Sequence, residues 1–178
     1  LNAEDHCALI AEVAAEHGLG RGRIAVEIQS YALTYAYGCA LAEALAPAEI
    51  ADGTAVLGGL RLLKSPAEMA YIREAARFAE SGLDTARRTL RPGISEIALA
   101  GAVEGEMRRA GCDYWAIPTE LAAGPRGTAM HATPRDRAIE SGELVHMEFA
   151  GVARRYHAVA LHTVALGRPS SRARDLYA

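Results

Sequence analysis

The sequence of 178 residues predicts an α+β domain that follows the end of an α/β domain. Two observations predict the α+β domain: a pair of helices expected over residues 65–110, and a pair of strands over residues 144–166 joined by a short turn. A helix, a strand and a second helix expected before residue 46 predict the α/β segment. The apolar content of 51% is sufficient for a packed core.

The first part of the chain reads as alternating helices and a strand. Residues 3–17 are expected to form an Ala-rich amphipathic helix that ends at Gly18. A short buried strand is expected at residues 23–27, and a second helix from about Leu33 to Leu45. Because the connections are short, this segment is typical of an α/β domain whose beginning is absent.

A long helix is predicted to begin at Ser65. Ser65 is suited to the N-cap, Pro66 to the first helical position, and Glu68 to the third position of a capping box. Apolar residues then recur at steps of three and four until a Pro-Gly break at residues 92–93. They are Met69, Ile72, Ala76, Ala79, Leu83, Ala86 and Leu90. We expect this stripe to pack against a core.

The second half of the chain is predicted to contain a helix, a long loop and a hairpin. The helix is expected at residues 95–110, with Gly111 as its terminator, and residues 114–122 are strand-like. Residues 124–142 read as a loop long enough to suggest a functional role. The hairpin strands are expected at residues 144–150 and 154–166, with residues 151–153 as the turn. A further helix is expected to begin at Asp175.

Composition excludes several classes of function. The formal charge is −3, and its 19 basic and 22 acidic residues are interspersed, so no basic surface for nucleic acid or an anionic membrane is indicated. No apolar run is long enough to span a bilayer. The three cysteines are widely spaced and lack a Cys-x-x-Cys pair, which argues against disulfides and a thiolate zinc site. We therefore expect a cytoplasmic protein.

Two residues stand out as chemical candidates. His131 lies in the loop, and imidazole can accept a proton from water and return it to a leaving group near neutral pH. Glu148 lies in an apolar strand, where a carboxylate is costly to bury unless it is paired. The alternatives for Glu148 are an exposed edge position or an ion pair with Arg154. Strand alternation places Leu144, His146 and Glu148 on one face.

The other polar residues of this region have open interpretations. Arg126 and Arg135 flank the loop histidine and are suited to gripping a carboxylate, although solvent exposure is an equal alternative. Three further histidines lie on the two strands, but strand alternation places them on different faces, so roles in packing or at the surface are favoured over a metal cluster. They are His146, His157 and His162.

Three segments together resemble the pita-bread family of Xaa-Pro aminopeptidases, prolidases and creatinase. They are residues 59–69, the loop Ala129-Met130-His131-Ala132-Thr133-Pro134, and the hairpin over residues 144–163. The resemblance extends from about residue 20 to the end of the chain. It implies that residues 1–62 are the C-terminal part of a creatinase-type N-terminal domain. Residues 63–178 would then be the first half of a catalytic domain made of two similar α+β halves.

The resemblance also implies roles for single residues. His131 stands at the loop histidine, a proton shuttle in creatinase and a substrate contact in the peptidases. Glu148 and Val159 stand at the two aspartates that bind metal in the peptidases, and the isopropyl group of Val159 offers no lone pair to an ion. Thr163 retains the family residue, whereas His162 stands where an arginine is common. A dinuclear metal site is therefore not expected.

These observations favour a metal-independent hydrolase of C–N bonds, similar to creatinase or ectoine hydrolase, acting on a small nitrogen-rich solute. In this interpretation His131 is catalytic, while Glu148, Val159, Thr163 and Arg126 line the substrate site, with no metal or cofactor. One alternative is an Xaa-Pro aminopeptidase or dipeptidase that uses a divalent metal such as Mn, Co or Zn. Another is a catalytically inactive pita-bread protein that binds a partner or peptide. The resemblance further implies a homodimer, a small-molecule or short-peptide substrate, and no activity of this chain in isolation.

Overall fold

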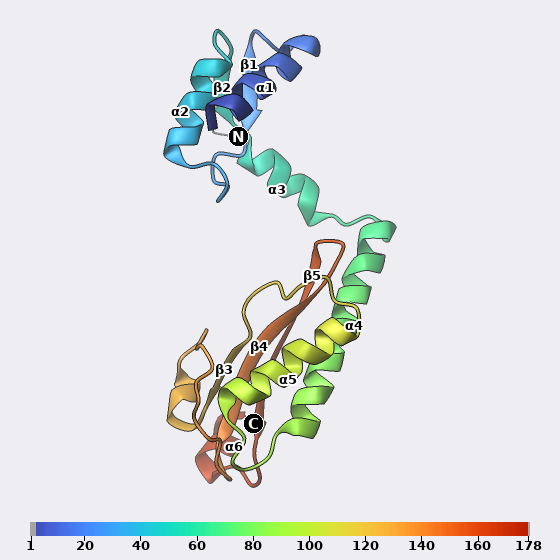
Figure 1. Cartoon of the computed structure of the whole chain (residues 1–178), viewed down its shortest axis with the longest axis vertical. Helices are drawn as coiled ribbons and strands as arrows, with labels where there is room; N and C mark the ends of the chain where they lie inside the picture. Colours follow the sequence, from blue (N-terminus) through green and yellow to red (C-terminus); the bar gives the residue numbers. More distant parts are fainter. Residues whose placement is uncertain (1–2, 178) are drawn as a thin grey trace. The chain divides into compact units, whose positions relative to one another are not determined.

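The computed structural model describes residues 3–177 and divides the chain into two compact units, residues 1–64 and residues 65–178 (Figure 1). The sequence placed the division after residue 62, and the structure places it after Lys64. Helices and strands occur in both units, so the expected α+β class is confirmed. Within the described residues, no helix combines the length and the apolar character that crossing a membrane requires.

The described part of the first unit contains three helices and a parallel pair of strands. Its elements are α1 (Ala3–Glu16), β1 (Arg23–Val26), α2 (Tyr35–Ala44), β2 (Glu49–Asp52) and α3 (Thr54–Leu62). Cys7, Leu41 and Leu45 form its small core. The elements α1, β1 and α2 were predicted, whereas β2 and α3 were not. Strand β2 is only four residues long, and two glycines interrupt the helical pattern of α3.

The second unit begins with the predicted capping box. The backbone N–H of Glu68 donates to the Ser65 hydroxyl at 3.3 Å, and the backbone N–H of Ser65 donates to the Glu68 carboxylate at 2.7 Å. Helix α4 (Pro66–Thr89) follows, with Pro66 in the first turn. This reciprocal pairing satisfies N–H groups that would otherwise lack partners at the start of a helix.

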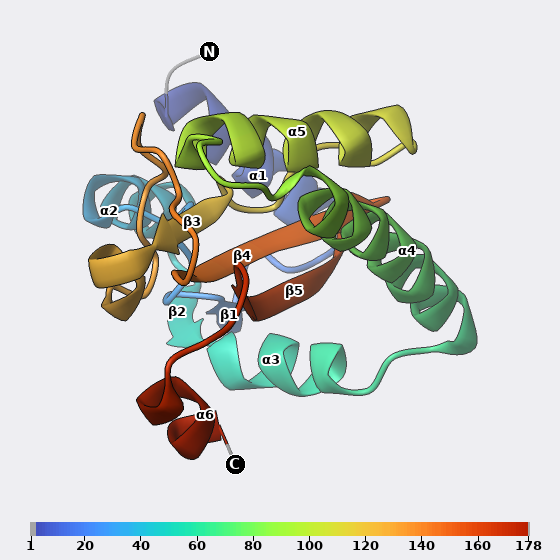
Figure 2. The ribbon, with the colours of Figure 1, turned by 90° about the horizontal axis from the view of Figure 1, so that it is seen from below.

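Helix α4 and helix α5 (Glu96–Arg109) pack on one face of a three-stranded antiparallel sheet (Figure 2). The strands are β3 (Glu120–Ala123), β4 (Leu144–Ala153) and β5 (Tyr156–Ala165), in the order β3-β4-β5. A short 3₁₀ helix, η1 (Gly124–Thr128), follows β3, and α6 (Ser171–Tyr177) follows β5. The core between sheet and helices includes Leu99, Val103, Met107, Leu121, Val145, Met147 and Phe149. The opposite face of the sheet carries the polar residues of interest.

Gly151 lies within β4 rather than in the turn, which corrects the prediction that residues 151–153 connect the strands. A β-carbon at Gly151 would contact the Ala75 carbonyl oxygen and lie 2.9 Å from the Ala79 nitrogen, so helix and strand backbones meet here. The turn consists of Arg154 and Arg155, with φ values of 50° and 69°. Two consecutive residues with positive φ are typical of a two-residue hairpin loop. Strand β3 is also shorter than the predicted 114–122.

Candidate functional site

Strand alternation separates a buried face of β4 from an open face. Val145, Met147 and Phe149 point into the core, whereas His146 and Glu148 are half-buried on the face away from the helices. Glu148 lies directly opposite Glu120 of β3 and Leu161 of β5. Residues directly opposite on neighbouring strands share a face, so the two glutamates lie side by side on the open face.

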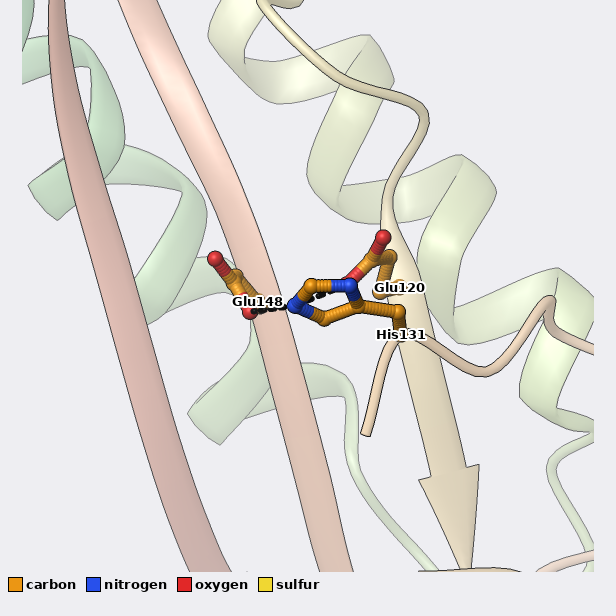
Figure 3. Close-up of side chains that lie close together, drawn as sticks. All are labelled: Glu120, His131 and Glu148. Carbon is orange, nitrogen blue, oxygen red and sulfur yellow. Dashed lines mark ion pairs between the residues drawn. The ribbon is translucent and has the colours of Figure 1, made fainter. Parts of the chain in front are cut away.

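His131 reaches this pair of glutamates from the loop that follows β3 (Figure 3). Its Nε2 atom lies 3.7 Å from Oε2 of Glu148 and 3.9 Å from Oε2 of Glu120. These are ion-pair distances, longer than a hydrogen bond. The imidazole is 65% exposed, and its backbone is left-handed with a φ of 55°. The imidazole therefore lies beside two carboxylates that come from neighbouring strands of the sheet.

Glu120 is the member of this group that the sequence analysis missed. Its Oε2 atom is buried and has no hydrogen-bond partner among the residues that the structure describes. The short segment Glu120-Leu121-Ala122 does contain a carboxylate next to a buried apolar residue. That signal was weak by itself, because the importance of Glu120 depends on a register that places it opposite Glu148.

A hollow of about 350 Å³ adjoins His131 between α5 and the loop. Its walls include Ile97, Glu104, Pro118, Thr119, Glu120 and Thr133. The hollow gives a small molecule access to the imidazole from the side of Glu120. The volume of this hollow and the carboxylates of Glu104 and Glu120 in its walls suit a small ligand that carries hydrogen-bond donors.

Two further residues predicted to line the site, Val159 and Thr163, lie on strand β5. Val159 lies on β5 opposite Ala150, 61% exposed, on the same face as Glu148. Thr163 lies opposite His146, and its Oγ1 atom is 3.2 Å from Nδ1 of that histidine. The structure thus places both side chains on the open face without bringing them to His131.

Arg126 has partners within the protein. Its guanidinium forms an ion pair with the buried carboxylate of Glu96 and donates to the backbone carbonyl of Thr133 at 2.9 Å. The prediction that Arg126 contacts a substrate stays a prediction.

The far end of the loop is closed by an ion pair between Arg137 and Glu143. The Arg137 guanidinium, followed by the backbone N–H of Glu140, holds the pKa of the Glu143 carboxyl below its ordinary value against the opposing effect of burial. Both ends of the loop are therefore tied to the folded unit by side-chain interactions.

The histidines of the hairpin lie in separate environments. His157 packs edge-on against the ring of Tyr114, and His146 contacts Thr163. His162 pairs with Met147, on the face of the sheet that carries the helices.

Glu120, His131 and Glu148 are also the residues that could bind a metal ion. Ligand atoms of Glu120, His131 and Glu148 lie within 4.8 Å of one another, and no other His, Cys, Asp or Glu in the described part of the chain joins them. This donor set is compatible with one cation. A pair of ions requires bridging carboxylates, and Val159 supplies no donor atom on the neighbouring strand. The residues of this chain therefore do not fit a dinuclear centre.

Comparison with known proteins identifies relatives over nearly the whole chain. The family model of metallopeptidase family M24 matches residues 70–178. Ectoine hydrolase of Halomonas elongata is 34% identical over 174 residues, covering 92% of this chain and 43% of the relative. An uncharacterized peptidase of Bacillus subtilis is 32% identical over 145 residues, covering 82% of this chain and 41% of the relative.

Solved structures show the same architecture. An Xaa-Pro dipeptidase from Bacillus anthracis has a TM-score of 0.82 and 27% identity, covering 96% of this chain and 47% of that chain. Prolidase from Pyrococcus furiosus has a TM-score of 0.81 and 23% identity, covering 96% and 48%. The chain thus spans less than half the length of these relatives and forms part of a pita-bread fold. It belongs to metallopeptidase family M24, a family of hydrolases and peptidases.

Proposed function

We propose that the protein hydrolyses a C–N bond in a small nitrogen-rich solute without a metal ion. The observation that carries this proposal is the position of the His131 imidazole beside two carboxylates, on a sheet face where Val159 offers no second metal-binding carboxylate. The 34% identity to ectoine hydrolase of Halomonas elongata supports the same class of substrate.

In the proposed reaction His131 moves one proton twice. Its free imidazole nitrogen takes a proton from a water molecule as the water oxygen attacks the carbon of the scissile bond. The resulting imidazolium then donates that proton to the departing nitrogen as the C–N bond breaks. The ring ends in its starting state, so each turnover consumes one water and leaves no net charge on the enzyme.

The two carboxylates have a supporting role in this sequence. The imidazolium formed in the first step lies 3.7 Å from Glu148 and 3.9 Å from Glu120, so both stabilise its positive charge. Their remaining oxygens accept hydrogen bonds from N–H groups of the substrate. Such contacts would hold a nitrogen-rich solute with its scissile bond close to the imidazole.

A second candidate function is a metal-dependent Xaa-Pro dipeptidase. The family match favours it, and the close grouping of Glu120, His131 and Glu148 provides ligand atoms for one ion. The two candidates differ in their response to chelation. Ectoine and an Xaa-Pro dipeptide should therefore be compared as substrates of the full-length protein, with and without EDTA. Hydrolysis of ectoine that survives EDTA supports the first proposal, and dipeptide hydrolysis abolished by EDTA supports the second.

The decisive variant is His131→Asn. Asparagine tolerates the left-handed backbone at this position better than most residues and removes the proton-transferring ring, so the change tests chemistry with little effect on the loop. We expect kcat to fall by roughly 10²–10⁴-fold with the fold retained. His157→Asn is the matched control, because that ring lies against Tyr114 and should leave kcat within about twofold. A kcat within about threefold of the parent for His131→Asn would refute the proton-transfer role.

A further inference from the structure

The loop that carries His131 is held with little help from apolar packing. Residues 124–135 include no buried residue, and Met130, next to His131, is 75% exposed. A loop of this kind is expected to be mobile unless hydrogen bonds hold it in place. The position of the imidazole between Glu120 and Glu148 therefore requires a polar anchor.

Glu96, the first residue of α5, occupies the place where such an anchor is needed. Its side chain is 0% exposed, and a buried carboxylate is costly unless charged or N–H partners surround it. The Glu96 carboxylate does not cap α5. The N-cap of that helix is Ser95, whose hydroxyl accepts a hydrogen bond from the backbone N–H of Ala98. The Glu96 carboxylate faces away from its own helix, toward the loop.

Within residues 3–177, the Glu96 carboxylate has three hydrogen-bond partners, and they come from the loop and its borders. Oε1 accepts from the backbone N–H of Ala123 at 3.0 Å, just before the loop. Oε2 accepts from the backbone N–H of Arg135 at 3.1 Å, just after His131, and pairs with the Arg126 guanidinium. Arg126 in turn donates to the carbonyl of Thr133. The Glu96 carboxylate thus binds the backbone on both sides of the loop, and through Arg126 it is also connected to Thr133.

The backbone of α5 adds to the same attachment. The N–H of Glu96 donates to the carbonyl of Arg137 at 3.0 Å, and the N–H of Ile97 donates to the carbonyl of Arg135 at 3.1 Å. These groups belong to the first turn of the helix, whose N–H groups have no partner within the helix. The start of α5 and the end of the loop therefore satisfy each other.

We propose that Glu96 is a positioning residue that fixes the His131 loop and sets the imidazole between the two glutamates of the sheet. Glu96 itself touches neither the imidazole nor the hollow beside it. The effect of Glu96 on turnover rests on the proposed function, whereas its effect on loop order does not.

Glu96→Gln tests the anchor, because the amide keeps the shape but turns an N–H donor toward the donors of Arg126 or Arg135. In the parent chain we expect backbone order parameters of about 0.8 for residues 127–133, and in the variant values below about 0.6. The matched control is Glu106→Gln on the same helix, which loses an exposed pair with Arg109 and should leave the loop unchanged. Loop order parameters equal to the parent's in a folded Glu96→Gln variant would overturn the proposal.

A second variant covers the case in which Glu96→Gln does not fold. Arg126→Met keeps apolar volume at the site and leaves Glu96 its two backbone donors, so we expect intermediate order parameters for residues 127–133. An unchanged loop in this folded variant would equally overturn the proposal.

Turnover separates the anchor from the chemistry. In the full-length protein, Glu96→Gln should lower kcat at least about tenfold with KM changed less than about threefold, because the imidazole is misplaced rather than removed. Loss of loop order with unchanged kcat would uphold the anchor and refute the catalytic role of His131.

Discussion

Gly151→Ala adds a single methyl group at the point where β4 meets α4. The new β-carbon would overlap the Ala75 carbonyl oxygen and lie 2.9 Å from the Ala79 nitrogen and 3.0 Å from the β-carbon of Phe78. Two of these three atoms belong to the helix backbone, which moves only if α4 moves. Relief of the clash therefore requires the helix to separate from the sheet over its buried residues Ala75 and Ala79.

The expected cost follows from this geometry. Overpacking of a core costs about 1–3 kcal/mol, and a backbone clash belongs at the upper end of that range. The lower entropy of alanine in the unfolded chain returns about 0.5–1 kcal/mol, which leaves a net loss of about 2 kcal/mol. For a chain of this size, that loss lowers the Tm by roughly 4–8 °C.

Two further glycines give a graded series. A β-carbon at Gly105 of α5 would meet no atom within 4 Å, so Gly105→Ala should raise stability by about 0.5–1 kcal/mol. A β-carbon at Gly82 would lie 3.0 Å from side-chain atoms of Met107 and Phe149, of which Met107 is the more flexible. We therefore expect the order of stability Gly105→Ala, then Gly82→Ala, then Gly151→Ala.

Urea unfolding followed by tryptophan fluorescence measures these differences. Trp115 is the only tryptophan of the sequence and lies in the second unit, so its signal reports that unit alone. A Gly151→Ala midpoint equal to or above that of the parent would show that α4 and β4 are not in direct backbone contact.

Three further outcomes are expected. Val159→Asp places a carboxylate on the same face as Glu148. We expect the parent to bind less than one Mn²⁺ ion tightly, and isothermal titration should show Mn²⁺ binding at least about tenfold tighter in the variant. Equal affinities would contradict the assignment of Val159. Because Arg137 lowers the pKa of Glu143, the stability that this carboxylate contributes is present above about pH 4.3 and is lost as pH falls through its folded pKa. Glu143→Gln should therefore flatten the acid side of a plot of Tm against pH, and an unchanged slope would refute this. Glu148→Gln should lower kcat without lowering the Tm of the second unit, and full turnover would exclude a role for its charge.

The sequence predicted those parts of the fold that have strong local signals. The Ser65 capping box and the apolar stripe of α4 are confirmed, as is the alternation that places His146 and Glu148 on one face of β4. These features depend on neighbouring residues or on a fixed period, which a sequence displays directly.

The parts that were missed depend on contacts between distant residues. Gly151 was predicted to lie in the turn, but it lies in β4, where the backbone of α4 approaches it closely. Glu120 acquires its position only through pairing with Glu148, and Glu96 only through the return of the loop to α5. Neither pairing leaves a short pattern in the sequence.

The positive φ of His131 sets a conflict between folding and chemistry at one position. A non-glycine residue in the left-handed region is strained by about 1–3 kcal/mol, so the loop is held in a conformation that its own residue disfavours. Selection for stability alone would place glycine here, and His131→Gly should fold more tightly while losing the imidazole. Histidine at position 131 therefore makes the fold less stable than glycine would. In a library of variants selected only for heat resistance, this histidine should be replaced early.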